Sequence, residues 1–314
     1  MKVLLAPMQG VVDQQMRRFL TDIGGIDCCV SEFIRVTDRL LPRRVFRRTC
    51  PELLNGGSTP AGTPVTIQLL GGVPEIVAIN AQRAVEMGAK GIDINFGCPS
   101  RFVNRKAGGA ILLKEPQRVQ QIVAAVREVV PGNIPFSAKI RLGYDDTSLT
   151  LENAHAVEAG GADSIVVHGR TKKEGYRPPA DWQWIARIRR SLTIPVVANG
   201  DINSLDDYLR CREISGCDDV MIGRGVLINP GLIQQIRQFQ TGASHSSVTW
   251  AHITPLIETM LLDGITAGVA DRHIVSRLKQ WLRYLKEHYH EAQQLFDNIR
   301  TLNDPHQVQR LLHK

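Results

Sequence analysis

The stretch Gly91-Ile92-Asp93-Ile94-Asn95-Phe96-Gly97-Cys98-Pro99-Ser100 joins an apolar run to a Gly-Cys-Pro turn. The run 91–95 predicts a buried β-strand, and the turn presents one thiol just after the strand ends. Gly97 allows close approach of the backbone, and Pro99 stops the chain from continuing at once as a helix. This geometry suits a reactive cysteine that faces a pocket, with a buried and inert thiol as the alternative.

A strand followed by a helix recurs along most of the chain. Strands are expected at 3–7, 28–33, 65–70, 91–95, 136–140, 164–168, 195–199 and 219–222. Helices are expected at 14–22, 75–86, 116–129, 151–159, 181–190 and 205–214. Most of the strands are apolar at consecutive positions, as strands covered on both faces should be. This pattern predicts an α/β fold, a (β/α)₈ TIM barrel, with a doubly wound open sheet as the alternative. The Arg-, Pro- and Gly-rich segment after the second strand is expected to be an elaborated loop.

The pattern changes after about residue 240. The run 242–247, Gly-Ala-Ser-His-Ser-Ser, is typical of a linker, and only helical periodicity follows it. One apolar stripe is formed by Ile274, Leu278, Trp281, Leu282 and Leu285. A second stripe, on another face, is formed by Arg272, Lys279, Arg283 and Lys286. We therefore expect a barrel domain over 1–241 and a small all-helical C-terminal domain over 242–314, with a basic face turned outward.

Composition excludes several classes of protein. Of 314 residues, 43% are hydrophobic, so a full core can form and disorder is not expected. No apolar run approaches the roughly 20 residues that span a bilayer, and Pro7 comes too early for a signal peptide. The six cysteines include no C-x-x-C pair and no zinc spacing. We expect a cytoplasmic protein with no membrane segment and no metal.

Basic residues are concentrated in two runs, within a net charge of +7. The run 35–48 holds six arginines and one acidic residue, and the run 272–286 holds five basic residues and no acidic one. Such concentration favours contact with a localised anionic partner, with two solvated faces as the alternative.

The predicted strand ends are polar or rich in glycine, and a barrel of this type places its site at those ends. Glycines at 200, 223 and 225, with Arg224, follow the last two strands, where backbone N–H groups can cradle a phosphate. Lys139 is expected to point inward, where a lysine is costly unless it meets an electron-rich partner such as a flavin ring. His168 either polarises that ring or hydrogen-bonds its own strand end. A thiol with an ordinary pKa of about 8.5 is mostly protonated at neutral pH, so Cys98 can act as a general acid.

Eight motifs in order resemble those of the bacterial tRNA-dihydrouridine synthases, and of their C-type subgroup in particular. They are Ala6-Pro7-Met8-x-Gly10-Val11-x-Asp13, Ser31-Glu32-Phe33, Gln68-Leu69-Leu70-Gly71, Asn95-x-Gly97-Cys98-Pro99-Ser100, Lys139-x-Arg141-Leu142-Gly143, Val167-His168-Gly169-Arg170-Thr171, Ala198-Asn199-Gly200-Asp201 and Met221-Ile222-Gly223-Arg224-Gly225. The segment Arg277-Leu278-Lys279-Gln280-Trp281-Leu282 also resembles that subgroup. One departure is Ala107, where the family commonly has glycine.

The resemblance implies an FMN-binding barrel that reduces the C5=C6 bond of a D-loop uridine, at position 16 for this subgroup, to 5,6-dihydrouridine. Reduced FMN would give hydride to C6, Cys98 would give a proton to C5, and NADPH would reduce FMN again. Cofactor contacts are carried over to Pro7, Met8, Gln68, Lys139, His168, Asn199, Gly200, Asp201, Gly223, Arg224 and Gly225. Substrate tRNA contacts are carried over to Arg35, Asn95, Arg141, Arg272, Arg277 and Lys279.

Two other functions compete with this one. An FMN barrel that reduces a free pyrimidine or small enone would explain the polar strand ends but not the basic tail. An RNA-binding protein without catalysis would be expected to lack Cys98 or Lys139, and both are present. The protein is expected to be a monomer, and the sequence leaves open NADPH against NADH and the choice of tRNA.

Overall fold

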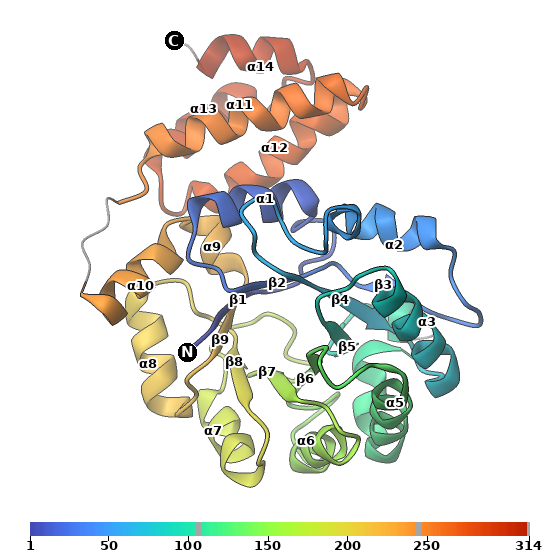
Figure 1. The fold of residues 1–314 in the computed structure, drawn as a ribbon. Coiled ribbons are helices and arrows are strands. Elements are labelled where there is room, and N and C mark those ends of the chain that lie inside the picture. Colours follow the sequence, from blue (N-terminus) through green and yellow to red (C-terminus); the bar gives the residue numbers. More distant parts are fainter. Residues whose placement is uncertain (105–107, 243–246, 313–314) are drawn as a thin grey trace. The chain divides into compact units, whose positions relative to one another are not determined.

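In the computed structural model, which describes residues 1–104, 108–242 and 247–312, parallel strands close into a barrel (Figure 1). The strands are β1 (Val3–Leu5), β2 (Cys28–Val30), β3 (Ile34–Arg35), β4 (Val65–Leu70), β5 (Ile92–Phe96), β6 (Phe136–Arg141), β7 (Ser164–His168), β8 (Val196–Asn199) and β9 (Val220–Ile222). Pairing of β2 with β4 closes the ring, and β3 pairs with β4 outside it. The eight-stranded barrel is therefore confirmed, and the open sheet is excluded.

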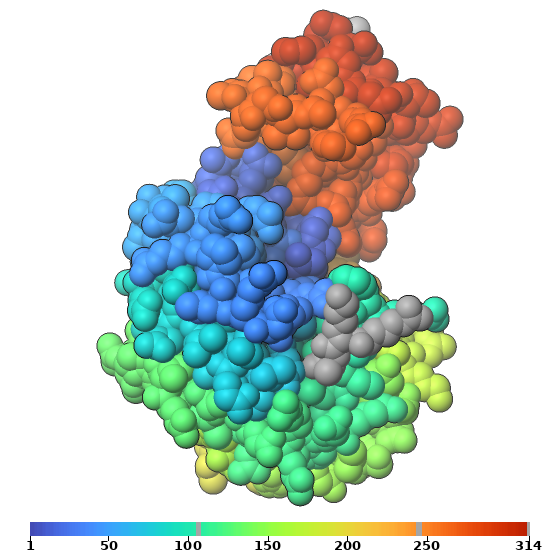
Figure 2. Space-filling view, turned by 90° about the vertical axis from the view of Figure 1, so that its right-hand side faces the viewer, coloured from blue at the N-terminus to red at the C-terminus, as the bar shows by residue number. Residues whose placement is uncertain are grey.

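The second predicted strand was too long, and the loop after it holds regular structure. The strand at 28–33 ends at Val30, since the Ser31 hydroxyl there accepts from the backbone N–H of Gln68 and donates to the carbonyl of Glu32. The chain then pairs again with β4 through Ile34. It goes on through α2 (Arg43–Thr49) and the 3₁₀ turn η1 (Pro51–Leu54), which lie on the outer surface of the barrel unit, in lighter blue in Figure 2.

Helices surround the barrel between consecutive strands. They are α1 (Gln14–Ile23), α3 (Pro74–Glu86), α4 (Arg101–Asn104), η2 (Gly109–Lys114), α5 (Pro116–Val129), α6 (Thr150–Ala159), α7 (Trp182–Ser191) and α8 (Leu205–Ser215). Pro74 and Pro116 each occupy the first turn of a helix, where the missing N–H has no intrahelical partner to lose.

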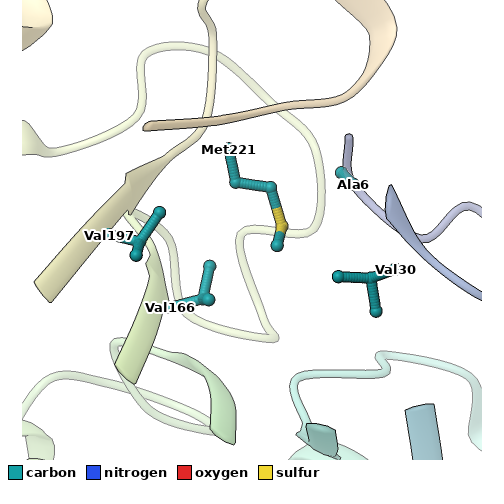
Figure 3. Packing of buried hydrophobic residues seen from close by; sticks show 5 residues of the cluster. All are labelled: Ala6, Val30, Val166, Val197 and Met221. Atoms are coloured by element: carbon teal, nitrogen blue, oxygen red, sulfur yellow. The ribbon is translucent and has the colours of Figure 1, made fainter. Parts of the chain in front are cut away.

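The interior of the barrel is divided into an apolar sector and a polar one. Figure 3 shows the apolar sector, in which Ala6, Val30, Val166, Val197 and Met221 pack together from β2, β7, β8, β9 and the end of β1. On β4, β5 and β6, alternate residues carry polar groups. Side chains alternate between the two faces of a strand, so these polar groups share the inward face. That sector consists of Gln68, Asp93, Asn95, Ser137, Lys139 and Arg141. The polar sector thus lies on neighbouring strands, where its members can bond one another.

The chain forms two compact units. The first comprises Met1–Asp22, Ile26–Ile202 and Asp206–Gly223, and the second comprises Ile23–Gly25, Asn203–Leu205 and Arg224–Lys314. The second holds α9 (Arg224–Ile228), α10 (Leu232–Thr241), α11 (Trp250–Thr266), α12 (Asp271–Leu285), α13 (His290–Ile299) and α14 (Pro305–Leu312). The apolar stripe predicted on α12 is buried, and the helical C-terminal region is confirmed.

The compact units divide the chain at 223/224, whereas our predicted functional division at 241/242 stays a prediction. Residues 243–246 of the predicted linker and Ala107 lie outside the described residues. In the described ranges, no helix has both the length and the apolar character needed to cross a bilayer.

Candidate active site

The turn after β5 is held by the side chain of Asn95. Its Oδ1 accepts the backbone N–H groups of Gly97 at 2.9 Å and Cys98 at 2.8 Å. The backbone N–H of Ala110 donates to the Cys98 carbonyl at 3.1 Å. The thiol is therefore carried on a turn that is fixed from both sides, and it lies at the carboxyl ends of the barrel strands, as predicted.

The environment of Cys98 keeps its thiol protonated. Burial raises the pKa of this thiol above its ordinary value, and a backbone hydrogen bond from Ser100 and the charge of Arg141 offset only part of that rise. Acid catalysis needs the protonated thiol, whereas a nucleophile would need a lowered pKa. The site therefore favours proton donation by Cys98.

We expect the alkylation of Cys98 by iodoacetamide to be slow at neutral pH and to accelerate up to at least pH 9. The thiolate is the reacting form, and a raised pKa keeps its fraction small until the solution is alkaline. Peptide mass spectrometry across a pH series measures the rate and separates Cys98 from Cys28, which is also partly buried. A midpoint below pH 8 would place a thiolate at Cys98 and contradict the acid role.

A chain of polar side chains leads from the turn into the barrel. Asn95 Nδ2 donates to Gln68 Oε1 at 2.8 Å, and Gln68 Nε2 donates to Asp93 Oδ2 at 2.6 Å. Ser137 Oγ donates to Asp93 Oδ1, also at 2.6 Å. Burial raises the pKa of Asp93 to about 6, against these two hydrogen bonds and the charge of Lys139.

Lys139 lies on β6, where its Nζ donates to Asn199 Oδ1 at 2.7 Å. A hydrogen bond from Asn199 Nδ2 to the Met221 carbonyl, at 2.8 Å, orients the Asn199 side chain. Burial, together with the charge of Arg141, lowers the pKa of Lys139 to about 7, although Asp93 opposes the shift. An amine with a pKa in this range gains its proton readily when negative charge develops beside it.

His168 and Asp201 are linked by a buried arginine that was quoted in a motif but given no role. The Arg170 guanidinium lies 3.2 Å from His168 Nε2 and forms an ion pair with Asp201. Asp201 adopts a left-handed backbone conformation, with φ 52°, and its carboxylate also accepts the backbone N–H of Ala180. The side chain of Asp201 is therefore bound within the protein by Arg170 and Ala180.

Glycines follow β8 and β9 directly, at positions 200 and 223. Gly200 has φ +123°, and a Cβ there would lie 2.9 Å from Ala180 Cβ and His168 Cδ2, so only glycine fits. A Cβ on Gly223 would lie 3.5 Å from Met8 Sδ, which places the Pro7–Met8 segment beside the end of β9. Arg224 and Gly225 begin α9 directly after it.

Arg141 is held by the loops around the barrel mouth. Its guanidinium donates to the carbonyls of Gly97, Thr171 and Gly175 and lies 5.1 Å from the centre of the Tyr176 ring. This fixes the loop that carries Tyr176, a residue that is 58% exposed.

Arg35 is the other predicted substrate contact in the barrel unit that has an aromatic neighbour. Its guanidinium lies 4.6 Å from the centre of the Phe102 ring, and its Nη2 is buried with no hydrogen-bond partner among the described residues.

The predicted contacts on α12 differ in exposure. Arg272 is exposed, whereas Arg277 and Lys279 are partly buried. Lys279 Nζ donates to the Leu302 carbonyl at 2.6 Å, and Arg277 hydrogen-bonds Gln280. The expectation that the whole basic stripe faces outward was therefore wrong for Lys279, because its long side chain bridges to the segment after α13.

Hydrogen bonds bring five of the predicted barrel residues together in two groups: Asn95, Cys98 and Gln68 form the first, and Lys139 and Asn199 form the second. Asp93, Ser137 and Tyr176 were not predicted to contact the site. An acidic residue in the middle of an apolar strand was a signal for Asp93. Nothing in the sequence marked Tyr176, which depends on a loop conformation. Among the described residues, no cluster of His, Cys, Asp and Glu could hold a metal ion.

The described geometry, with a closed barrel and polar groups at its carboxyl edge, is that of a barrel enzyme. Solved structures agree in fold: a 2-naphthoyl-CoA reductase complex matches with a TM-score of 0.58 and 13% identity, covering 76% of this chain and 50% of that one. A variant of NCR from Zymomonas mobilis matches with a TM-score of 0.53 and 12% identity, covering 80% of this chain and 90% of that one. Likeness at this level of identity concerns the fold alone.

Sequence comparison specifies the family. The family model described as dihydrouridine synthase (Dus) matches residues 4–313. A tRNA-dihydrouridine(16) synthase of Neisseria meningitidis is 48% identical over 312 residues, which cover 99% of this chain and 94% of the relative. Its counterpart from Ralstonia nicotianae is 50% identical over 310 residues, which cover 98% of this chain and 94% of the relative. The chain belongs to the dihydrouridine synthase family, and it is an oxidoreductase enzyme.

Proposed function

We propose that this protein reduces uridine 16 in the D-loop of tRNA to 5,6-dihydrouridine, with FMN as its cofactor and NADPH as the reductant. The observation that carries the proposal is the placement of a protonated thiol, Cys98, on a turn fixed by Asn95 at the end of β5. The position in tRNA is inferred from the relatives in Neisseria meningitidis and Ralstonia nicotianae, which are tRNA-dihydrouridine(16) synthases.

The residues fit a flavin phosphate. Gly200 and Gly223 directly follow β8 and β9, and Gly200 must be glycine because a Cβ there would meet Ala180 and His168. Arg224, the residue after Gly223, adds a positive charge. Asn199, Gly200, Asp201, Gly223, Arg224 and Gly225 would hold the phosphate, and Pro7, Met8, Gln68, Lys139 and His168 would hold the ring. FMN, when bound, supplies the hydride that uridine C6 accepts.

The protein residues supply the proton and the orientation of the base. Cys98 donates its proton to C5 of uridine, and the raised pKa keeps that proton in place until the base is bound. Asn95 and Arg141 contact the uracil. Lys139 holds a proton near negative charge on the reduced ring, for which its pKa of about 7 is suited.

A uridine in folded tRNA must leave its stack to reach a group inside the barrel mouth. Recognition then depends on contacts with the phosphate backbone and on the shape of the RNA. Arg35 and, on the helical unit, Arg272, Arg277 and Lys279 would supply such contacts. We further propose that the protein works as a monomer in the cytoplasm.

The test is to map dihydrouridine by primer extension on tRNA from cells that lack this protein, before and after its restoration. Loss and return of a stop at position 16 alone supports the reaction and the position. A stop at another D-loop uridine would retain the chemistry and exclude position 16. No change at any uridine, together with reduction of free uridine by the purified protein, would favour the small-molecule reductase.

We expect charge reversal on α12 to weaken tRNA binding through electrostatics. In Arg272→Glu/Arg283→Glu, both exposed arginines lose their phosphate contacts, and the affinity should fall at least tenfold at low salt. The slope of log affinity against log salt should decrease in magnitude by about 2. Lys279 is left in place because its Nζ bonds the Leu302 carbonyl.

The matched control reverses two exposed arginines outside α12, Arg300→Glu/Arg310→Glu, and so changes the net charge equally. Binding is measured by filter retention at several salt concentrations. Equal losses in the two double variants would show a general effect of charge and remove α12 from the RNA surface.

A further inference from the structure

Asp93 is an acidic side chain in the interior of the barrel, and the proposed reaction does not use it. It is fully buried, and each of its carboxylate oxygens accepts one hydrogen bond at 2.6 Å, from Ser137 and from Gln68. A buried carboxylate is costly even when it is hydrogen-bonded, and an apolar residue of similar size often packs with greater stability. Stability of the barrel therefore does not account for an acidic residue here.

The carboxylate determines which way the Gln68 side chain points. The two ends of an amide have similar shapes, but one donates hydrogen bonds and the other accepts them. An ionised carboxylate only accepts, so it binds the Nε2 end of Gln68 and leaves Oε1 for Asn95. Asn95 must then offer Nδ2 to Gln68, which turns its Oδ1 toward the backbone N–H groups of Gly97 and Cys98.

We propose that Asp93 is a positioning residue for Cys98, which acts by fixing the orientation of two successive amides, Gln68 and then Asn95. With either amide reversed, donors would face donors, and the turn would lose the two hydrogen bonds that hold it. The inference rests on the proposed function only in so far as Cys98 is the proton donor. The orientation of the turn can be measured without that reaction.

Two substitutions at Asp93 separate orientation from structure. Asp93→Leu removes both carboxylate oxygens, so no acceptor remains to fix the orientation of the Gln68 amide. Asp93→Asn keeps one oxygen for Gln68 and gives Ser137 an N–H to accept, so the conservative variant should restore the turn. Ser137→Ala is the matched control, because it removes one hydrogen bond of Asp93 and keeps the bond to Gln68.

The first readout is the alkylation rate of Cys98 in the full-length protein, followed by peptide mass spectrometry. We expect Asp93→Leu to change that rate about tenfold, and Asp93→Asn and Ser137→Ala to change it less than threefold. The second readout is a single turnover of pre-reduced enzyme with tRNA, which Asp93→Leu should slow by about 10- to 100-fold.

A double-mutant cycle with Asn95→Ala tests whether Asp93 acts on Cys98 through Asn95. If Asp93 acts through Asn95, Asp93→Leu should add little to the effect of Asn95→Ala on Cys98 alkylation. Additive effects, or an unchanged alkylation rate in folded Asp93→Leu, would overturn the proposal. If Asp93→Leu does not fold, Gln68→Met interrupts the same chain one step later, and an unchanged rate there would overturn it equally. Altered alkylation without any reduction of tRNA would instead reject the proposed function and retain the positioning role.

Discussion

Replacing Cys98 with alanine should lower single-turnover reduction of tRNA by between about 10² and 10⁴, the usual contribution of a general acid. FMN binding and tRNA affinity should stay within about twofold, because the thiol is one small group on a turn held by backbone hydrogen bonds to Asn95. Asn95 Oδ1 and the Ala110 N–H contact only backbone atoms of the turn, so both bonds survive the substitution.

The measurement uses enzyme reduced beforehand, mixed with tRNA, with flavin reoxidation followed by absorbance. Cys28→Ala is the control, since that thiol is also partly buried and has a raised pKa but lies on β2. An unchanged rate of uridine reduction in Cys98→Ala would assign the proton to another group. A loss of bound flavin would instead make the cysteine a structural residue of the cofactor site.

Replacing Lys139 with methionine should slow reduction of the bound flavin by about 10²- to 10³-fold, comparable to the loss of one preorganised donor to a developing anion. Methionine fills a similar volume, but it offers neither the proton nor the hydrogen bond to Asn199. Negative charge that develops on the ring would then lack the proton that Lys139 would supply. Stopped-flow absorbance with NADPH in excess gives the rate.

The same substitution at Lys114, an exposed lysine paired with Asp145, is the control for a general Lys→Met change. The pH dependence gives a second check. With a pKa of about 7, Lys139 is protonated in acid and loses its charge as the pH rises, so the wild-type rate should fall above neutral pH if binding leaves that pKa unchanged. If a bound anion raises the pKa of Lys139, the fall in rate would begin at higher pH. A Lys139→Met variant that keeps the wild-type rate and pH profile would exclude the role of the amine.

The barrel could be predicted from the sequence because most strands show a short apolar run followed by helical periodicity, and β4 begins and ends where that pattern placed it. The structure of the segment after β2 could not be predicted in this way. Its second pairing with β4 depends on contacts between residues that are distant in sequence, such as Ser31 and Gln68. Local patterns do not contain that information.

The position of a side chain was predictable where its motif lies on a strand or directly after it, as with Lys139 on β6 and Cys98 after β5. It was less so where a side chain's partners come from other strands or from loops. Asp93 was read as part of an apolar run, although its bonds to Gln68 and Ser137 make it part of the polar sector. Lys279 followed the periodicity of its helix but reaches the Leu302 carbonyl, which no helical repeat predicts.

The two sectors of the barrel interior should respond differently to substitution. Val30, Val166, Val197 and Met221 only pack against one another, so substitutions there should change thermal stability with little effect on turnover. In the sector of β4 to β6, apolar replacements should make the barrel more resistant to heat and less active. An engineer who seeks a more robust variant can therefore vary the apolar sector. A library confined to Val30, Val166, Val197 and Met221 should retain far more active members than one confined to Gln68, Asp93, Asn95 and Lys139.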